Sequence, residues 1–96
     1  MKCVFIVYNI AIHGEILEAL EKAGLRDYTR WKEVTGVGKK SGPHLDTHVW
    51  PAKNSAMIVM AEEKKAILLM EEIRELQERM VGVGLKAFCL AVDDCA

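Results

Sequence analysis

The stretch KCVFIVY, residues Lys2–Tyr8, is a continuous apolar run rich in β-branched and aromatic side chains. Such a run predicts a buried β-strand. Ala56–Ala61 and Ala87–Val92 have the same character and predict two further strands. All three runs are apolar at both alternating positions, whereas a strand with one wet face should alternate apolar and polar residues. We therefore expect both faces of this sheet to be covered.

The segments between these strands follow other patterns. Ile12–Ala23 places apolar residues on one helical face, and Gly24 is expected to end that helix in the left-handed conformation. Glu62–Met80 carries the clearest helical stripe in the chain. Tyr28–Thr35 has charged residues in both alternating sets, which suits an edge strand. The predicted order of elements is therefore βαββαβ.

This order is typical of the α+β, ferredoxin-like arrangement, in which two helices cover one face of a four-stranded antiparallel sheet. The chain has 96 residues, which predicts a single domain over residues 1–96 with a loop at 36–54. Because the chain has no spare element for the second apolar face, we expect another subunit to cover it in a closed symmetric oligomer. The alternative is that small residues and sulfur atoms tolerate partial exposure there.

Composition excludes several classes of protein. Thirteen Lys and Arg against fourteen Asp and Glu argue against nucleic-acid binding by phosphate neutralisation. No apolar run approaches the roughly 20 residues that span a bilayer, and the N-terminus lacks a secretory signal, so we expect a cytoplasmic protein without membrane insertion. Three cysteines without a CxxC pair make disulfides unexpected. Cys3 and Cys89 are predicted to be buried and inert, and Cys95 to be a loose terminal thiol.

The stretch Leu20–Gly42 resembles the PII signal-transduction family, which comprises nitrogen regulatory protein P-II and its relatives. The residues that carry this resemblance are Leu20, Ala23, Gly24, Leu25, Thr29, Glu33, Val34, Gly36, Gly38 and Gly42. In that family the same spacing ends the first helix, forms the second strand and enters the long T-loop. The resemblance implies a homotrimer whose sheets pack inward. It also implies that small effectors, often adenine nucleotides, bind between subunits, and that the loop controls a partner protein.

The candidate effector site combines two Gly-rich segments. The segment Gly36–Gly42 is basic and could approach an anion closely, although a flexible solvated loop base is the alternative. The segment after the second helix is similar to the Gly- and Lys-containing phosphate loop of the nitrogen regulators, with Leu85 where their Lys would follow. The basic residues that these proteins carry beyond the last strand are replaced here by Asp93 and Asp94. The candidate effector-binding residues are Gly36, Gly38, Lys39, Lys40, Gly82, Gly84 and Lys86.

A second hypothesis concerns the centre of the loop, which differs from that of the nitrogen regulators and contains no Tyr. In an extended chain His44, Asp46 and His48 would project from one side and could form a facial triad for a divalent ion. The alternative is two unrelated histidines in a polar loop. A metal site would indicate a metal-binding or metal-tolerance protein similar in architecture to CutA. Trp50 is a candidate contact for a protein partner, and Trp31 is either such a contact or a packed side chain.

No arrangement of residues indicates an enzyme, because neither a Ser-His-Asp nor a Cys-His set can be assembled from the sequence. His13 and Glu15 are interpreted as part of the start of the first helix, where an acidic side chain is favourable. The primary hypothesis is therefore a trimeric PII-like regulator that senses a small effector, with an adenine nucleotide or a divalent metal ion as the candidate ligand.

Overall fold

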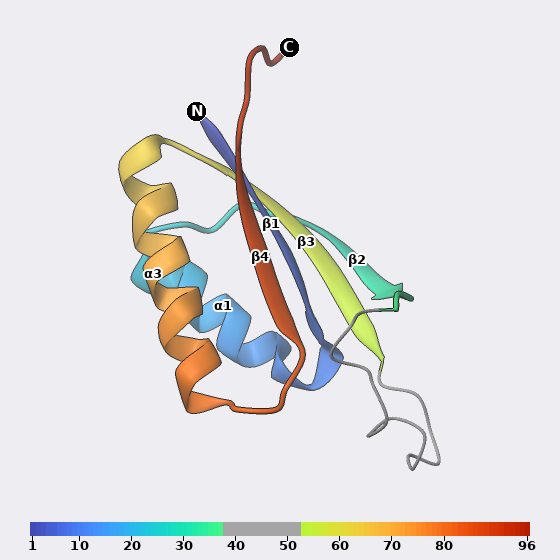
Figure 1. Ribbon diagram of the computed structural model, residues 1–96. Coiled ribbons are helices and arrows are strands. Elements are labelled where there is room, and N and C mark those ends of the chain that lie inside the picture. Colours follow the sequence, from blue (N-terminus) through green and yellow to red (C-terminus); the bar gives the residue numbers. More distant parts are fainter. Residues whose placement is uncertain (38–52) are drawn as a thin grey trace.

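The computed structural model describes residues 1–37 and 53–96. The predicted order βαββαβ is confirmed, with a short 3₁₀ helix before the first α-helix. The elements are β1 (Lys2–Asn9), η1 (Ile10–Ile12), α1 (His13–Lys22), β2 (Thr29–Val34), β3 (Asn54–Ala61), α3 (Glu63–Arg79) and β4 (Leu85–Ala91), as Figure 1 shows.

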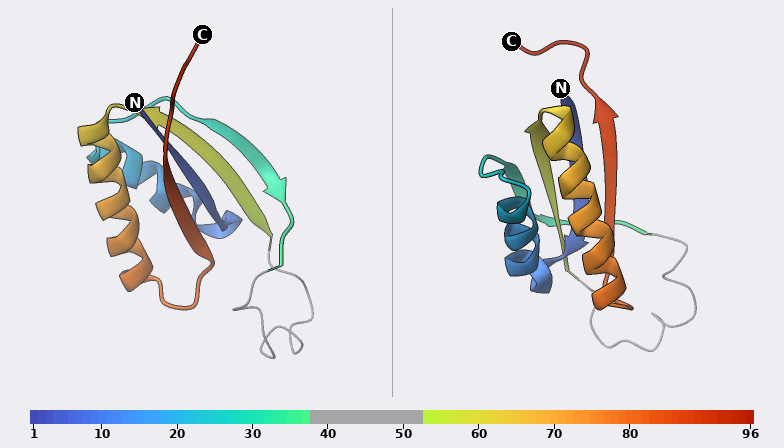
Figure 2. Two further views of the ribbon diagram at one scale, coloured as in Figure 1. Left: turned by 45° about the horizontal axis from the view of Figure 1, so that its top comes forward. Right: turned by 90° about the vertical axis from the view of Figure 1, so that its left-hand side faces the viewer.

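The four strands form one antiparallel sheet in the order β2-β3-β1-β4. β1 lies in the centre, where Ile6 pairs with Met57 of β3 and Phe5 pairs with Phe88 of β4. The prediction that the charged strand β2 lies at an edge is confirmed. Both helices lie on the same side of the sheet (Figure 2), which completes the ferredoxin-like arrangement.

The hydrophobic core lies between the sheet and the two helices. From β1 it receives Val4, Ile6 and Tyr8, which alternate with residues that face the other side. α1 contributes Ile16 and Leu20, and α3 contributes an apolar stripe. The buried residues of that stripe are Ala66, Leu69, Ile73 and Leu76. Each large apolar side chain buried here contributes about 1.5–3 kcal/mol of transfer free energy, which makes this layer the main source of stability.

The opposite face of the sheet is apolar and open among the described residues. Phe88 and Leu90 are 50% and 49% exposed, and Met60 on β3 is 47% exposed. Cys3 and Phe5 of β1 lie directly opposite Leu90 and Phe88 in the register, so they belong to the same face. The expectation that these strands are apolar on both sides is therefore confirmed in the structure. We call this surface the open face.

The prediction that Cys89 is buried is wrong, because its side chain is exposed on β4. β4 is an edge strand with a neighbouring strand on one side only, so its side chains have fewer neighbours than those of β1. Cys3 is half-buried. Burial, and secondarily the nearby Cys89 thiol, raise the pKa of Cys3, so its reactive thiolate form is disfavoured.

Gly24 ends α1 as predicted, with a φ of +77°. The Leu25 N–H donates to the Leu20 carbonyl and the Gly24 N–H donates to the Glu21 carbonyl, both at 2.9 Å, which is the Schellman pattern. Lys65 of α3 donates to the Gly24 carbonyl at 3.0 Å and so ties the two helices together. In residues 1–37 and 53–96, neither helix is long and apolar enough to cross a membrane.

Candidate functional site

Three segments that are distant in the sequence meet at one end of the sheet, at the base of the loop. The Asn9 N–H donates to the Gly84 carbonyl, and the Ile10 N–H donates to the Lys53 carbonyl, both at 2.9 Å. The junction of β1 and η1 therefore holds the turn between α3 and β4 beside the start of β3. Asn54 Oδ1 lies only 3.9 Å from the point where a Cβ on Gly84 would be. Figure 1 shows this turn and the loop stem at the same end of the molecule.

Four of the candidate effector residues belong to this end. Gly36 is exposed two residues after β2, and Gly82 and Gly84 lie in the turn before β4. Gly82 has a φ of +87°, so a residue with a side chain would be strained there. Lys86 is exposed and pairs with Val7, which places it on the same side of the sheet as the open face.

Gly38, Lys39 and Lys40 lie outside the described residues, as do the predicted metal ligands His44, Asp46 and His48 and the candidate partner contact Trp50. Within residues 1–37 and 53–96, no three His, Cys, Asp or Glu side chains gather as a group that could hold a metal ion. The metal hypothesis therefore stays a prediction.

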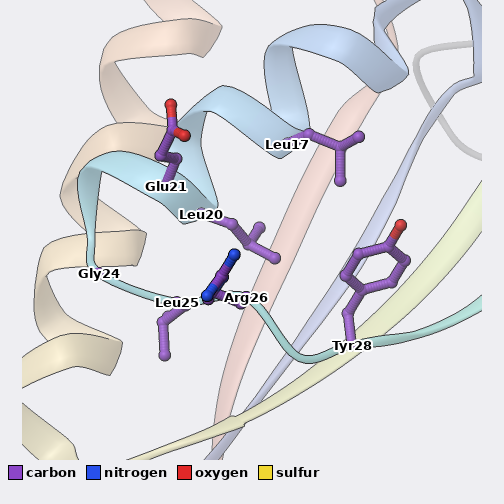
Figure 3. A pocket seen from close by; sticks show the side chains of 7 residues that line it. All are labelled: Leu17, Leu20, Glu21, Gly24, Leu25, Arg26 and Tyr28. Atoms are coloured by element: carbon purple, nitrogen blue, oxygen red, sulfur yellow. The ribbon is translucent and has the colours of Figure 1, made fainter.

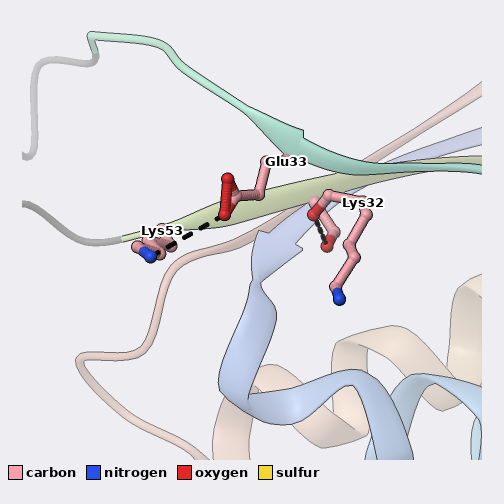
Figure 4. Close-up of polar contacts among 4 residues, drawn as sticks. Lys32, Glu33 and Lys53 are labelled. Atoms are coloured by element: carbon pink, nitrogen blue, oxygen red, sulfur yellow. Dashed lines mark hydrogen bonds and ion pairs between the residues drawn. The ribbon is translucent and has the colours of Figure 1, made fainter.

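The stem of the loop is held by contacts between β2 and β3. The register of β2 shifts between Trp31 and Val34. The buried Ser55 hydroxyl donates to the carbonyl of Lys32 within this irregular stretch. Glu33 and Lys53 form an ion pair at 3.7 Å on the surface (Figure 4), which contributes about 0–1 kcal/mol because both side chains are well exposed.

A buried polar cluster, which the sequence did not indicate, lies on the helix side of this stem. Tyr8 Oη lies 2.7 Å from His13 Nδ1, and the two rings are stacked with their centroids 5.8 Å apart. Arg30 Nη2 donates to Ser55 Oγ at 3.1 Å, and the buried Arg30 Nε has no hydrogen-bond partner among the described residues. We call Tyr8, His13, Arg30 and Ser55 the polar cluster.

Burial is the main influence on the titratable groups of the polar cluster. It raises the pKa of Tyr8, against a weaker opposite effect of Arg30. It also lowers the pKa of His13, and the positive charge of Arg30 acts in the same direction. The interpretation of His13 as part of the helix start is therefore incomplete. Glu15 does lie in the first turn of α1, but the His13 ring is bound to Tyr8.

Two of the depressions on the surface of residues 1–37 and 53–96 have volumes of about 440 Å³ each. The first lies on the helix side, around the end of α1 and the connection to β2 (Figure 3). It is lined by Leu17, Leu20, Glu21, Gly24, Leu25, Arg26 and Tyr28. The second is an apolar groove on the open face, lined by Cys3, Phe5, Trp31, Val34, Ala56, Ile58 and Leu90. Trp31 is half exposed in this groove and is therefore not a fully packed side chain.

Comparison with known proteins gives one match in sequence and several in structure. The family model of nitrogen regulatory protein P-II matches residues 1–96. No curated protein shows a significant sequence match. A structure of CPII from Thiomonas intermedia K12, a nitrogen regulatory PII-like protein described as bound to ADP, AMP and bicarbonate, aligns with a TM-score of 0.68. The two chains are 19% identical, and the alignment covers 97% of this chain and 88% of that one.

Two further structures support the same fold. The apo form of CPII from Thiomonas intermedia K12 aligns with a TM-score of 0.65 and 16% identity, over 95% of this chain and 89% of that one. A protein from Thermus thermophilus described as a PII-like signalling protein aligns with a TM-score of 0.67 and 19% identity, over 92% and 82% of the two chains.

Proposed function

The chain belongs to the nitrogen regulatory protein P-II family, and on this premise we propose that it is a trimeric regulator that binds an adenine nucleotide at the loop base. The observation that carries the proposal is the position of Lys86. It lies on the side of the open face, at the end of the sheet where the Gly82–Gly84 turn meets the loop stem. A ligand bound there would lie against a neighbouring subunit.

The open face supports the trimer. Phe88, Leu90 and Met60 are half exposed on it, and a contiguous apolar surface of this kind is typical of an interface. A three-fold arrangement with the sheets packed inward would cover this surface on every subunit at once.

The chemistry of the loop base suits a phosphate-bearing ligand. Gly82 and Gly84 lack a Cβ, so a ligand can approach the backbone N–H groups of the turn. Lys86 supplies a positive charge for a phosphate oxygen. The fold is shared with CPII, described as bound to ADP and AMP, which makes these nucleotides the first probes.

The regulatory output would come from the loop at 36–54. Effector binding at its base would change the loop's shape and thereby its contact with a regulated protein, as the family resemblance implies. The alternative ligand, a divalent ion held by His44, Asp46 and His48, makes a different prediction. A metal response would be lost in both His44→Ala and His48→Ala, whereas a nucleotide response would be unchanged.

The test is calorimetric titration with ADP, AMP and ATP, together with Zn²⁺, Ni²⁺ and Cu²⁺, on protein whose mass is measured by light scattering. We expect a trimer that binds an adenine nucleotide, and Lys86→Gln should weaken that binding at least about tenfold, since a charge-assisted hydrogen bond contributes about 1.5–3 kcal/mol. Lys64→Gln is the matched control, because Lys64 is an exposed lysine of α3. A monomer, or equal affinities in the two variants, would contradict the proposal.

A further inference from the structure

A continuous series of polar contacts connects the start of α1 with the loop stem. His13 Nδ1 contacts the Tyr8 hydroxyl, and Tyr8 lies directly opposite Ser55 in the register of β1 and β3. Arg30 donates to Ser55 Oγ, which donates in turn to the carbonyl of Lys32. Tyr8 and Ser55 are 1% and 0% exposed, so water does not replace these contacts readily. The proposed effector site uses none of these side chains, and the function of the series is therefore open.

Ser55 is the point where the side chains of the polar cluster meet the backbone of β2. Lys32 has no register partner on β3, because the pairing shifts between Trp31 and Val34. The Ser55 hydroxyl satisfies the Lys32 carbonyl instead. A β-bulge redirects the strand that contains it, so this bond helps to set the direction in which β2 runs toward Gly36.

The number of protons in the cluster depends on the charge of His13. A neutral His13 that carries its own proton on Nε2 can accept a hydrogen bond from the Tyr8 hydroxyl at Nδ1. A protonated His13 carries a proton on both nitrogens, so Nδ1 becomes a donor and Tyr8 Oη must accept. The Tyr8 proton then needs another acceptor. Ser55, which lies directly opposite Tyr8 in the register, carries the neighbouring acceptor Oγ, and this atom already accepts from Arg30.

The charges around His13 also oppose its protonation. Arg30 on β2 carries the charge that acts on it, and Tyr8 on β1 is its hydrogen-bond partner. Tyr28 on the connection to β2 acts on Tyr8, and Ser55 on β3 is uncharged. None of the carboxylates that the structure describes is among the groups that perturb His13. A proton taken up from solvent therefore places a second positive charge beside Arg30.

We propose that the polar cluster is a proton-sensing element that regulates the loop base. Protonation of His13 turns the Tyr8 hydroxyl toward Ser55, where it competes with Arg30. Displacement of Arg30 from Ser55 removes a side-chain bond between β2 and β3 beside the Lys32 carbonyl, so the exit of β2 shifts relative to Gly84 and Lys86. The inference rests on the proposed effector site, because acid then weakens effector binding. By linkage, a bound effector favours neutral His13 to the same extent.

The first experiment needs no effector. The chain has three histidines, so the double variant His44→Ala/His48→Ala leaves His13 as the single one. In NMR spectra from pH 8 to pH 5, we expect the amide signals of Lys32 and Ser55 to move with the same midpoint as the His13 ring. When Tyr8→Phe is added, the His13 ring should still titrate, but the amide signals of Lys32 and Ser55 should no longer follow it. Amides that stay still, or that move equally without the Tyr8 hydroxyl, would overturn the proposal.

The second experiment connects the cluster to binding, with ADP as the probe. Between pH 7.5 and pH 5.5 the wild type should lose about fivefold more ADP affinity than His13→Gln, the lower end of typical coupling between sites. Because ADP itself changes protonation equally in both measurements, that contribution cancels when the two proteins are compared. Equal losses in the two proteins would refute the regulation. If ADP binds neither protein at any pH while the amides of Lys32 and Ser55 still follow His13, the effector site is wrong and the proton-sensing element stands.

Discussion

The two faces of the sheet are built by the same strands but are completed in different ways. On the helix side, Val4 and Ile6 are fully buried by elements of their own chain. On the open face, Phe88 and Leu90 of β4 keep about half of their surface exposed. The comparison shows that one face is covered by the chain's own helices, whereas the other stays apolar and exposed among the described residues. The proposed trimer is the arrangement that would cover it.

The largest effect is expected from a charge placed on the open face. Leu90→Glu would bury an unpaired carboxylate in every subunit of a trimer, and an uncompensated buried charge costs about 3–5 kcal/mol. Light scattering should then give the mass of a single 10.8 kDa chain, with the circular dichroism of a folded protein. Leu68→Glu is the control, because Leu68 is exposed to a similar extent on α3. An unchanged trimer in Leu90→Glu would show that this face is not the interface.

A cavity on the helix side should act on the subunit itself. Ile6→Ala removes part of a fully buried side chain, which costs about 2–5 kcal/mol in the free energy of unfolding. Urea denaturation measures this loss, and dilution of the protein should not change it. A loss below about 1 kcal/mol would contradict the assignment of the main core to this side.

A smaller effect is expected at the end of α1. Gly24→Ala forces a side chain into the left-handed conformation and should destabilise the subunit by about 1–2 kcal/mol. Gly14→Ala is the matched control in the same helix, because a Cβ there meets nothing within 4 Å. It should stabilise the protein by about 0.5–1 kcal/mol. Thermal denaturation measures both effects. Melting temperatures that change in the same direction in the two variants would contradict this expectation.

The smallest effect concerns pH and the polar cluster. Because burial holds the pKa of His13 below its ordinary value of 6.5, the unfolded chain binds more protons in that range. The free energy of unfolding should therefore fall as pH drops through about 6.5, until the pKa of the folded state is passed, and it should not depend on His13 above about pH 7. His13→Gln should lose this part of the pH dependence. An identical stability profile in the variant would show that His13 is not perturbed.

The order of elements could be predicted from the sequence because it depends on local periodicity. Lys2–Tyr8 and Glu62–Met80 carry the apolar spacing of a strand and a helix, and the observed bounds differ by at most one residue at either end. The end of α1 at Gly24 was predictable for the same reason, since only a residue without a Cβ enters the left-handed conformation at little cost. The apolar character of both faces could also be predicted, because side chains project to alternate faces along a strand and both alternating sets are apolar here.

The polar cluster could not be predicted in this way. Tyr8, His13, Arg30 and Ser55 lie on four different elements, and no spacing relates His13 to Ser55. The burial of Cys89 was predicted wrongly because an apolar run does not reveal whether its strand lies at the centre or the edge of the sheet. For the candidate site, the sequence indicated Gly82, Gly84 and Lys86, but their position beside the loop stem depends on the bond from Asn9 to Gly84.

The types and order of the elements, and the apolar character of both faces of the sheet, were thus legible in the sequence, since these follow from side-chain chemistry repeated along the chain. Only the tertiary structure decided which side chains meet: Tyr8 with His13, Ser55 with the Lys32 carbonyl, and the turn at Gly84 with the start of β3. The physical reason is that pairing and register bring distant residues together, and the free energy of those contacts does not exist until the sheet has formed.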